Sequence, residues 1–215
     1  SISLEASELL ELFQWKQSDE VVSHSLDQIA EELADVLIYS FMLADNLQLD
    51  VEKIIEDKER IQWFAAKQAN AKDAFFVGRG IDYAICMEGS LKMKEISYLH
   101  AEAYAAGEMK HGPIALIDEG FPVVAIATKS PVYDKVVSNL QESRARGACI
   151  IAVATEGDEE IAKHANHVIY VPKVRDAFSP ITASVPLQLL SRAVAVKRGC
   201  DVDQPRNLAK SVTVE

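Results

Sequence analysis

The chain has 215 residues, of which 49% are hydrophobic and 26% charged, with a formal net charge of −11. This composition indicates a folded globular protein and excludes an intrinsically disordered one. No apolar run approaches the roughly 20 residues of a membrane-spanning helix, and no signal-peptide pattern opens the sequence. The three cysteines are widely spaced and fit neither a disulfide framework nor a zinc site. We therefore expect a cytoplasmic protein that binds neither membranes nor nucleic acid, since nucleic acid requires a basic face.

The negative charge is confined to the first quarter of the chain. Residues 1–58 hold 14 acidic and 3 basic residues, whereas 59–215 hold 19 of each. This asymmetry predicts two units with different roles. The stretch 1–77 lacks Gly and Pro, and its first part has apolar residues at helical spacing. We therefore predict an all-helical unit over 1–58.

Two pairs of acidic residues are candidate metal ligands in this helical unit. Glu5 and Glu8 stand three positions apart, as do Glu32 and Asp35, so each pair shares one face of a helix. If the helices pack antiparallel, the four carboxylates converge, and a hard divalent cation such as Mg²⁺ would relieve their repulsion. A solvated acidic face is the alternative interpretation.

The acidic pairs and their surroundings resemble a known family. Segments 5–8, 10–16 and 31–39 are similar to the MazG-like nucleotide pyrophosphohydrolases, whose pattern is ExxE, a spacer and ExxD. The resemblance implies that Mg²⁺ is bound by both acidic pairs, and that a nucleoside triphosphate is hydrolysed to monophosphate and pyrophosphate. It also implies that Trp15 lies beside the base and Tyr39 near the phosphates.

The remainder of the chain alternates apolar runs with helical segments. Runs of this kind are typical of parallel strands buried on both faces, so we predict a doubly wound α/β domain, with sites beyond the carboxyl ends of its strands. The loops 78–80, 128–130 and 155–157 are either ordinary turns or phosphate sites. We expect strands at 74–77, 122–127, 149–154 and 167–171, a weaker one at 100–104, and helices at 58–72, 81–98, 132–147, 158–164 and about 181–198.

The stretch 87–113 concentrates chemically useful side chains. Glu88, Lys92 and Glu95 share a helix face, either as a solvated row of ion pairs or as part of a site. His111 lies in a loop between Lys110 and a Gly-Pro pair, where it is either a surface residue or a functional one.

This part of the chain resembles a second family. Segments 76–80, 87–113 and 201–215 are similar to the glucosamine-6-phosphate synthase family, over the second of its two sugar-isomerase (SIS) domains and its C-terminal tail. The resemblance implies conversion of a fructose-6-phosphate imine to glucosamine 6-phosphate. It implies that Glu95 moves the proton between C1 and C2, and that the ammonium of Lys92 lies beside it. His111 would open the sugar ring across a subunit interface, and Lys210 would contact the reactive end of the sugar.

We therefore predict an α/β SIS domain over 59–215, preceded by a partial MazG-like helical unit over 1–58, with a continuous helix through the junction at 56–62. The expected function is phosphosugar binding or isomerisation in an oligomer of at least two subunits. Family members carry a further SIS domain that grips the phosphate and a glutaminase domain; neither is in this sequence, so glutamine-dependent amination is not expected. One alternative is a Mg²⁺-dependent nucleotide pyrophosphohydrolase. Another is a non-catalytic oligomeric fusion, natural or engineered.

Overall fold

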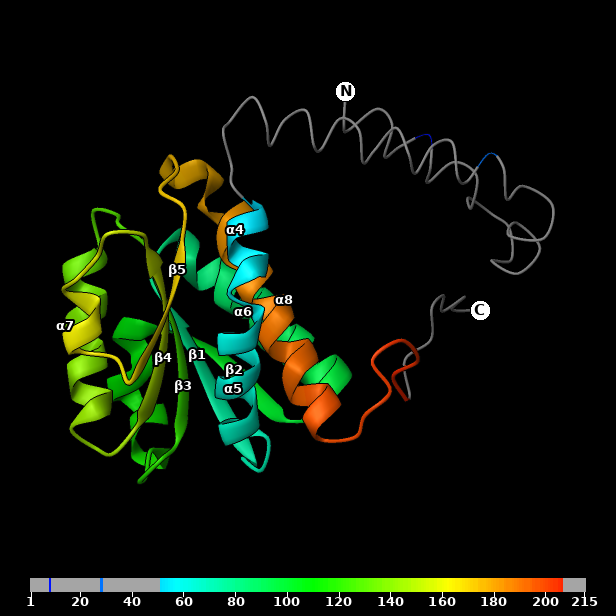
Figure 1. Cartoon of the computed structure of the whole chain (residues 1–215). Coiled ribbons are helices and arrows are strands. Elements are labelled where there is room, and N and C mark those ends of the chain that lie inside the picture. The colour runs from blue at the N-terminus through cyan, green and yellow to red at the C-terminus, as the bar shows by residue number, and fades with distance from the viewer. Residues whose placement is uncertain (1–7, 9–27, 29–50, 207–215) are drawn as a thin grey trace. The chain divides into compact units, whose positions relative to one another are not determined.

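The structure, a computed structural model, describes residues 51–206 together with Glu8 and Gln28, both of which are helical and exposed. The chain divides into two compact units, one of which comprises residues 51–208. This unit contains all the helices and strands drawn in colour in Figure 1, and the description below concerns it alone.

Five parallel strands form one sheet in the order β2-β1-β3-β4-β5. All five predicted strands are present, including the weaker one, and the predicted doubly wound α/β fold is confirmed. The central strands carry apolar side chains on both faces because helices cover both faces, which is why they appear as continuous apolar runs. The strands are β1 (Asp73–Gly78), β2 (His100–Ala105), β3 (Pro122–Ala127), β4 (Cys149–Thr155) and β5 (His167–Val171).

Two layers of helices cover the sheet (Figure 1). One layer contains α4 (Val51–Glu56), α5 (Lys58–Gln68), α6 (Ile81–Ser97) and α8 (Ser179–Lys197). The other contains α7 (Tyr133–Arg144) and the 3-10 helices η1 (Ala106–His111), η2 (Pro113–Leu116) and η3 (Ile161–Lys163). A further 3-10 turn, η4 (Asp176–Phe178), leads into α8.

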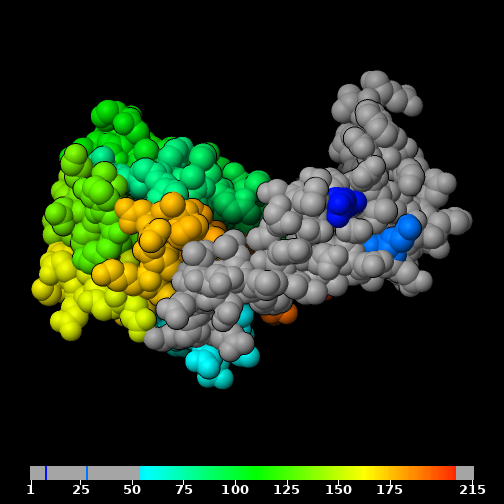
Figure 2. All heavy atoms as spheres, turned by 90° about the horizontal axis from the view of Figure 1, so that it is seen from above, coloured from blue at the N-terminus to red at the C-terminus, as the bar shows by residue number. Residues whose placement is uncertain are grey.

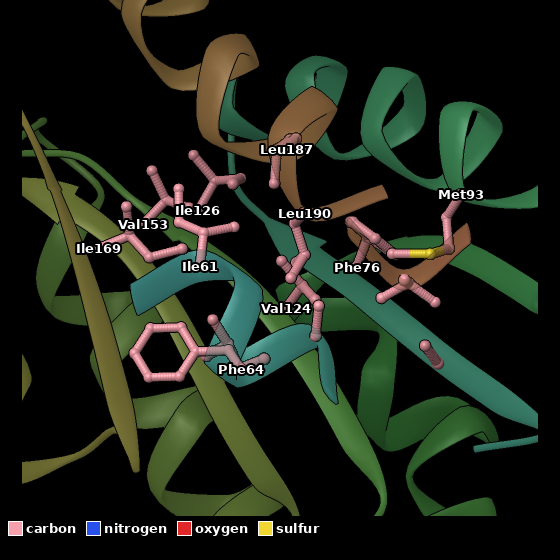
Figure 3. Close-up of a cluster of buried hydrophobic side chains, with 14 of the residues drawn as sticks. Ile61, Phe64, Phe76, Met93, Val124, Ile126, Val153, Ile169, Leu187 and Leu190 are labelled. Atoms are coloured by element: carbon pink, nitrogen blue, oxygen red, sulfur yellow. The ribbon is translucent and has the colours of Figure 1, made fainter. Parts of the chain in front are cut away.

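The alternation of side chains along β1 divides the core into two clusters. Phe76 points into the cluster beneath α5, α6 and α8, whereas Phe75 points into the cluster beneath α7 and η1. Figure 3 shows the first cluster, in which Met93 of α6 and Leu187 of α8 lie close to Phe76. Helix α6 approaches this core closely at Gly89, where an added Cβ would lie 2.6 Å from Leu187 Cδ1. The helix that carries the predicted acid/base residues is therefore anchored against α8 and β1.

Two predicted helices differ from the observed ones. The continuous helix expected through 56–62 is interrupted at Asp57, whose carbonyl accepts bonds from the N–H groups of Arg60 and Ile61. Both Ile54 and Ile61 are buried, so the break lets α4 and α5 each pack an apolar side against α8. The helix expected at 158–164 is only the 3-10 helix η3, because the Asp158 carboxylate holds the start of the segment in a tight turn.

Candidate active site

Lys92 and Glu95 form an ion pair on α6. Lys92 Nζ lies 2.8 Å from Glu95 Oε2 and 3.7 Å from Glu88 Oε1, as the helical spacing predicted. The hydrogen bond to Glu95 raises the pKa of Lys92, so the ammonium is charged at neutral pH. The Glu95 side chain is 26% exposed and that of Glu88 is 44% exposed. Glu95 is thus the more sheltered of the two carboxylates, and it is held by a cation while still open to a ligand.

This pair lies toward the amino ends of the strands. Helix α6 runs back from the carboxyl end of β1, and its last turn leads directly into His100, which pairs with Asp73 at the start of both strands. The expectation of a site beyond the carboxyl ends is therefore not met for Lys92 and Glu95. The reason is their position near the C-terminus of a crossover helix, because such a helix ends beside the start of the next strand.

His111 is the last residue of η1, which follows the carboxyl end of β2. The imidazole is largely exposed, and its Nδ1 lies 3.1 Å from Glu108 Oε2. The neighbouring Lys110 forms a 2.8 Å ion pair with Glu142 of α7. His111 therefore lies on a segment that is fastened to the α7 layer.

Arg79 packs against the 3-10 helix η1 that carries His111. Its Nε and Nη2 donate hydrogen bonds of 3.2 and 3.0 Å to Asn139 Oδ1, and an added Cβ at Gly107 would lie 2.5 Å from Nη2. Gly107 is thus required because the guanidinium occupies the space of a side chain. A role for Arg79 was not predicted, since its partners lie 28 and 60 positions away in the sequence.

A single copy of the chain does not bring His111 to Glu95. Glu95 lies in the helix layer on one face of the sheet and His111 in the layer on the other face. Glu95 is near the amino ends of the strands and His111 near their carboxyl ends, and the six residues of β2 span about 20 Å between these ends. An active site that uses both side chains requires two copies of the chain.

The loops at the carboxyl ends of the strands form structural turns. The Thr128 N–H and hydroxyl donate to the carboxylate of Asp82, and the Thr155 hydroxyl accepts from the Lys129 N–H. Asp82 is fully buried, and burial raises its pKa to about 6, although the two bonds from Thr128 oppose this rise. These bonds favour the turn interpretation for the loops 128–130 and 155–157, in which the buried Ser130 hydroxyl has no hydrogen-bond partner among the described residues.

Tyr98 joins the end of α6 to the C-terminal part of the chain. It is the one non-glycine residue with positive φ in the described part of the molecule, at 56°, a conformation that costs about 1–2 kcal/mol. Its hydroxyl accepts a 2.8 Å hydrogen bond from the N–H of Arg206, whose guanidinium lies 4.2 Å from the ring centroid. Sequence patterns gave no signal for this contact, because the two residues are 108 positions apart.

A groove of about 470 Å³ lies between α6 and the edge strand β2. Met87 and Leu91 are 47% and 43% exposed beside it, although both are large and apolar. The surface of α6 is partly visible beside that of α8 in Figure 2. The groove is lined by Tyr83, Met87, Ser90, Leu91, Lys94, Glu102, Ala103 and Tyr104.

The other predicted site residues are not placed by the structure. Of the four predicted metal ligands only Glu8 is described; Glu5, Glu32 and Asp35 lie outside the described residues, as do Trp15, Tyr39 and Lys210. Within 51–206, Glu8 and Gln28, no three His, Cys, Asp or Glu side chains are arranged to hold a metal ion. In the same part of the chain, no helix has the length and apolarity to cross a membrane.

Comparison with known proteins identifies the class of this domain. Residues 68–198 match the model of the SIS domain family, and residues 1–69 match that of the MazG-like family. Because the SIS match spans more than half of the chain, the chain belongs to the SIS domain family. Both resemblances predicted from the sequence are confirmed.

The most informative relatives are isomerising aminotransferases. The chain is 59% identical over 165 residues to glutamine–fructose-6-phosphate aminotransferase of Thermus thermophilus, covering 77% of this chain and 27% of that protein. It is 55% identical over 174 residues to the enzyme of Clostridium acetobutylicum, covering 80% and 29%. A solved structure, the C-terminal domain of glucosamine-fructose-6-phosphate aminotransferase from Francisella tularensis, aligns with a TM-score of 0.69 at 36% identity, covering 86% of this chain and 50% of that one. The chain thus spans less than a third of the length of these two curated relatives.

Proposed function

We propose that the SIS domain binds a phosphosugar and catalyses isomerase chemistry between ketose and aldose forms, as in the interconversion of fructose 6-phosphate and an aldose 6-phosphate. The observation that carries the proposal is the 2.8 Å ion pair between Lys92 and Glu95 on a partly exposed face of α6. The 59% identity to an isomerising aminotransferase supports it.

Glu95 would act as the base that takes a proton from one sugar carbon and returns it to the neighbouring one. Such a transfer requires a carboxylate that is ionised and within hydrogen-bonding reach of the substrate. The ammonium of Lys92, 2.8 Å from Glu95 Oε2, would hold that carboxylate in place for the transfer. The same ammonium would lie close to the negative charge that develops on the enediolate, where it stabilises the transition state.

His111 would open the sugar ring from a second copy of the chain, since one copy holds it on the opposite face of the sheet from Glu95. Lys210, four positions beyond Arg206 in the sequence, would contact the reactive end of the sugar. In such a homo-oligomer, the exposed side chains of Met87 and Leu91 beside the α6–β2 groove would lie at the interface.

The test is the interconversion of fructose 6-phosphate and glucose 6-phosphate, followed by a coupled assay. Glu95→Gln is expected to reduce kcat by about 100-fold or more, the usual contribution of a general base. Glu88→Gln is the matched control, because Glu88 also pairs with Lys92 on the same helix face. It lies about two helical turns from Glu95, so this variant is expected to retain activity. Equal loss in both variants would mean that the activity depends on negative charge on α6 and not on proton transfer by Glu95.

A mixing experiment tests the shared site. Glu95→Gln and His111→Gln are each expected to be inactive, but a dimer with one subunit of each retains one complete site. Random exchange between two-fold dimers makes half of them mixed, so about a quarter of the parent activity should return. If subunit exchange is verified and no activity returns, the shared site is refuted. Either both residues then act within one subunit, or His111 is not part of the active site.

A second candidate function rests on the match of residues 1–69 to the MazG-like family. We propose that Glu5, Glu8, Glu32 and Asp35 would hold Mg²⁺, which suits a donor set made only of carboxylate oxygens. The bound ion would assist attack by water on a nucleoside triphosphate, with Trp15 and Tyr39 contacting the nucleotide. Pyrophosphate release from a panel of dNTPs tests this function, with Glu32→Gln as the inactive control. No metal-dependent release from any of them would refute it.

A further inference from the structure

The 3-10 helix η1, which carries His111, is held by its contacts with the α7 layer. Its residues Ala106 and Met109 are buried in the core beneath α7. Lys110 Nζ also forms a 2.8 Å ion pair with Glu142 of α7. A 3-10 helix has poorer hydrogen-bond geometry than an α-helix, so a segment of only six residues depends on such outside contacts for its position. The place of His111, the last residue of η1, is therefore determined by what η1 packs against.

The guanidinium of Arg79 joins η1 to α7. Its Nε and Nη2 donate hydrogen bonds of 3.2 and 3.0 Å to Oδ1 of Asn139, a buried residue of α7. The same guanidinium packs on Gly107 of η1, where an added Cβ would lie 2.5 Å from Nη2, 3.1 Å from Cζ and 3.3 Å from Nη1. A lysine could not make both contacts, because its ammonium is a single point charge without a planar fork of donors.

The contacts of Arg79 assign it to His111 rather than to Glu95. In the sequence Arg79 comes two positions before α6, the helix that carries Glu95. Its side chain, however, bonds to α7 and packs on η1, in the layer that contains His111. Because the two layers lie on opposite faces of the sheet, loss of the guanidinium leaves a gap beside η1 and not beside Glu95.

We propose that Arg79 is a positioning residue for His111, which fixes η1 against α7 and so sets the point from which the imidazole reaches a sugar bound to a second copy of the chain. The proposal rests on the proposed isomerase function. Without the guanidinium, Gly107 would face an unfilled space and η1 would be free to shift toward α7. A misplacement of about 1 Å in a reacting group can lower the rate about 100-fold. Arg79 therefore acts on the reaction without touching the sugar.

The first test compares Arg79→Ala with Arg144→Ala in the isomerase assay. Arg79→Ala is expected to lower kcat about tenfold or more with little change in KM, because the groups that hold the sugar are retained. Arg79→Lys is expected to recover little of this loss. Arg144 is the matched control, because its guanidinium also belongs to α7 but donates to the Lys163 carbonyl of η3, and Arg144→Ala is expected to retain kcat. Unchanged kcat in Arg79→Ala, or equal losses in both variants, would overturn the proposal.

The second test separates a role through His111 from a role through Glu95. In a dimer with shared sites, each site takes Glu95 from one subunit and His111 from the other. Mixing Arg79→Ala with Glu95→Gln therefore leaves one complete site in each mixed dimer, and for a tenfold loss in Arg79→Ala the activity should rise from about 5% to about a quarter of the parent value. Mixing Arg79→Ala with His111→Gln should give no rise, because both changes then impair the same residue.

The other outcomes of the mixing experiment would contradict the proposal, provided that subunit exchange is verified. A rise with His111→Gln and none with Glu95→Gln would mean that Arg79 acts through α6. A rise in neither mixture would mean that Arg79→Ala damages the domain as a whole.

A third test does not depend on activity. Hydrogen exchange followed by mass spectrometry compares the opening of η1 in the parent chain and in Arg79→Ala. The amides of 106–111 are expected to exchange about tenfold faster in the variant, while those of β4 keep the parent rate. If the parent chain converts no sugar phosphate, the proposed function fails, whereas faster exchange at η1 still supports the positioning of this segment by Arg79. Unchanged exchange at η1, or an equal increase in β4, refutes the positioning role whatever the activity.

Discussion

Replacing Asp82 with asparagine tests the effect of a buried carboxylate at the start of α6. Asp82 is fully buried, and burial raises its pKa from 3.8 to about 6. Each pKa unit corresponds to 1.36 kcal/mol, so ionised Asp82 destabilises the fold by about 3 kcal/mol at pH 7. The asparagine carbonyl can accept from the Thr128 N–H while its amide donates to the Thr128 hydroxyl. Asp82→Asn is therefore expected to stabilise the chain by up to about 3 kcal/mol at pH 7.

The pH dependence gives the sharper test. Between pH 4 and 6 the folded state retains a proton on Asp82 that the unfolded state releases, so the parent gains stability as the pH falls through this window. The advantage of the variant should shrink to about 1.5 kcal/mol at pH 5. Urea unfolding of both chains at pH 7 and pH 5, followed by circular dichroism, measures the two differences. A variant that is less stable at pH 7, or a difference that does not change with pH, would refute the reasoning.

Three further substitutions test the packing that places the site, each by urea unfolding. Phe76→Ala, in the core beneath α6, is expected to cost about 3–5 kcal/mol; a cost below 1 kcal/mol would mean that the core closes around the gap. Gly89→Ala should destabilise despite the roughly 1 kcal/mol gained in helix propensity, since the new Cβ meets Leu187 and the Phe76 ring; net stabilisation would contradict this. Gly107→Ala should cost about 1–2 kcal/mol by displacing the Arg79 guanidinium, and the same change in Arg79→Ala should cost nothing further.

The sheet could be predicted from the sequence because its signals are local. The runs that became β3 and β4 are apolar at nearly every position, since both faces of those strands are covered. Even the weaker β2 was found, although its outer edge leaves four of its residues half-buried. The helix at 158–164 was wrong because a side-chain carboxylate, Asp158, holds the backbone in a tight turn that periodicity does not register.

The candidate site could be predicted only in part. The spacing of Lys92 and Glu95 on one helix determines their contact, and the structure places them 2.8 Å apart. Three contacts join residues 46 to 108 positions apart: the bond from Arg206 to Tyr98, the bonds from Thr128 to Asp82 and the bonds from Arg79 to Asn139. Such contacts depend on the order of strands in the sheet. No local pattern of residue types could therefore indicate them.

Helices α4 and α5 belong to one family match by sequence and to the core of the other by packing. Both helices fall within residues 1–69, the MazG-like match, yet Ile54, Ile61 and Phe64 are buried in the same core as residues of the SIS match. The predicted junction at 58–59 falls in the first turn of α5, whereas the compact unit begins at Val51. The segment 51–68 is therefore part of a folded core, since removing residues 1–58 would take Ile54 out of that core. A cut before Val51 would leave both helices with the SIS domain, whereas a cut at the end of the MazG-like match would remove them.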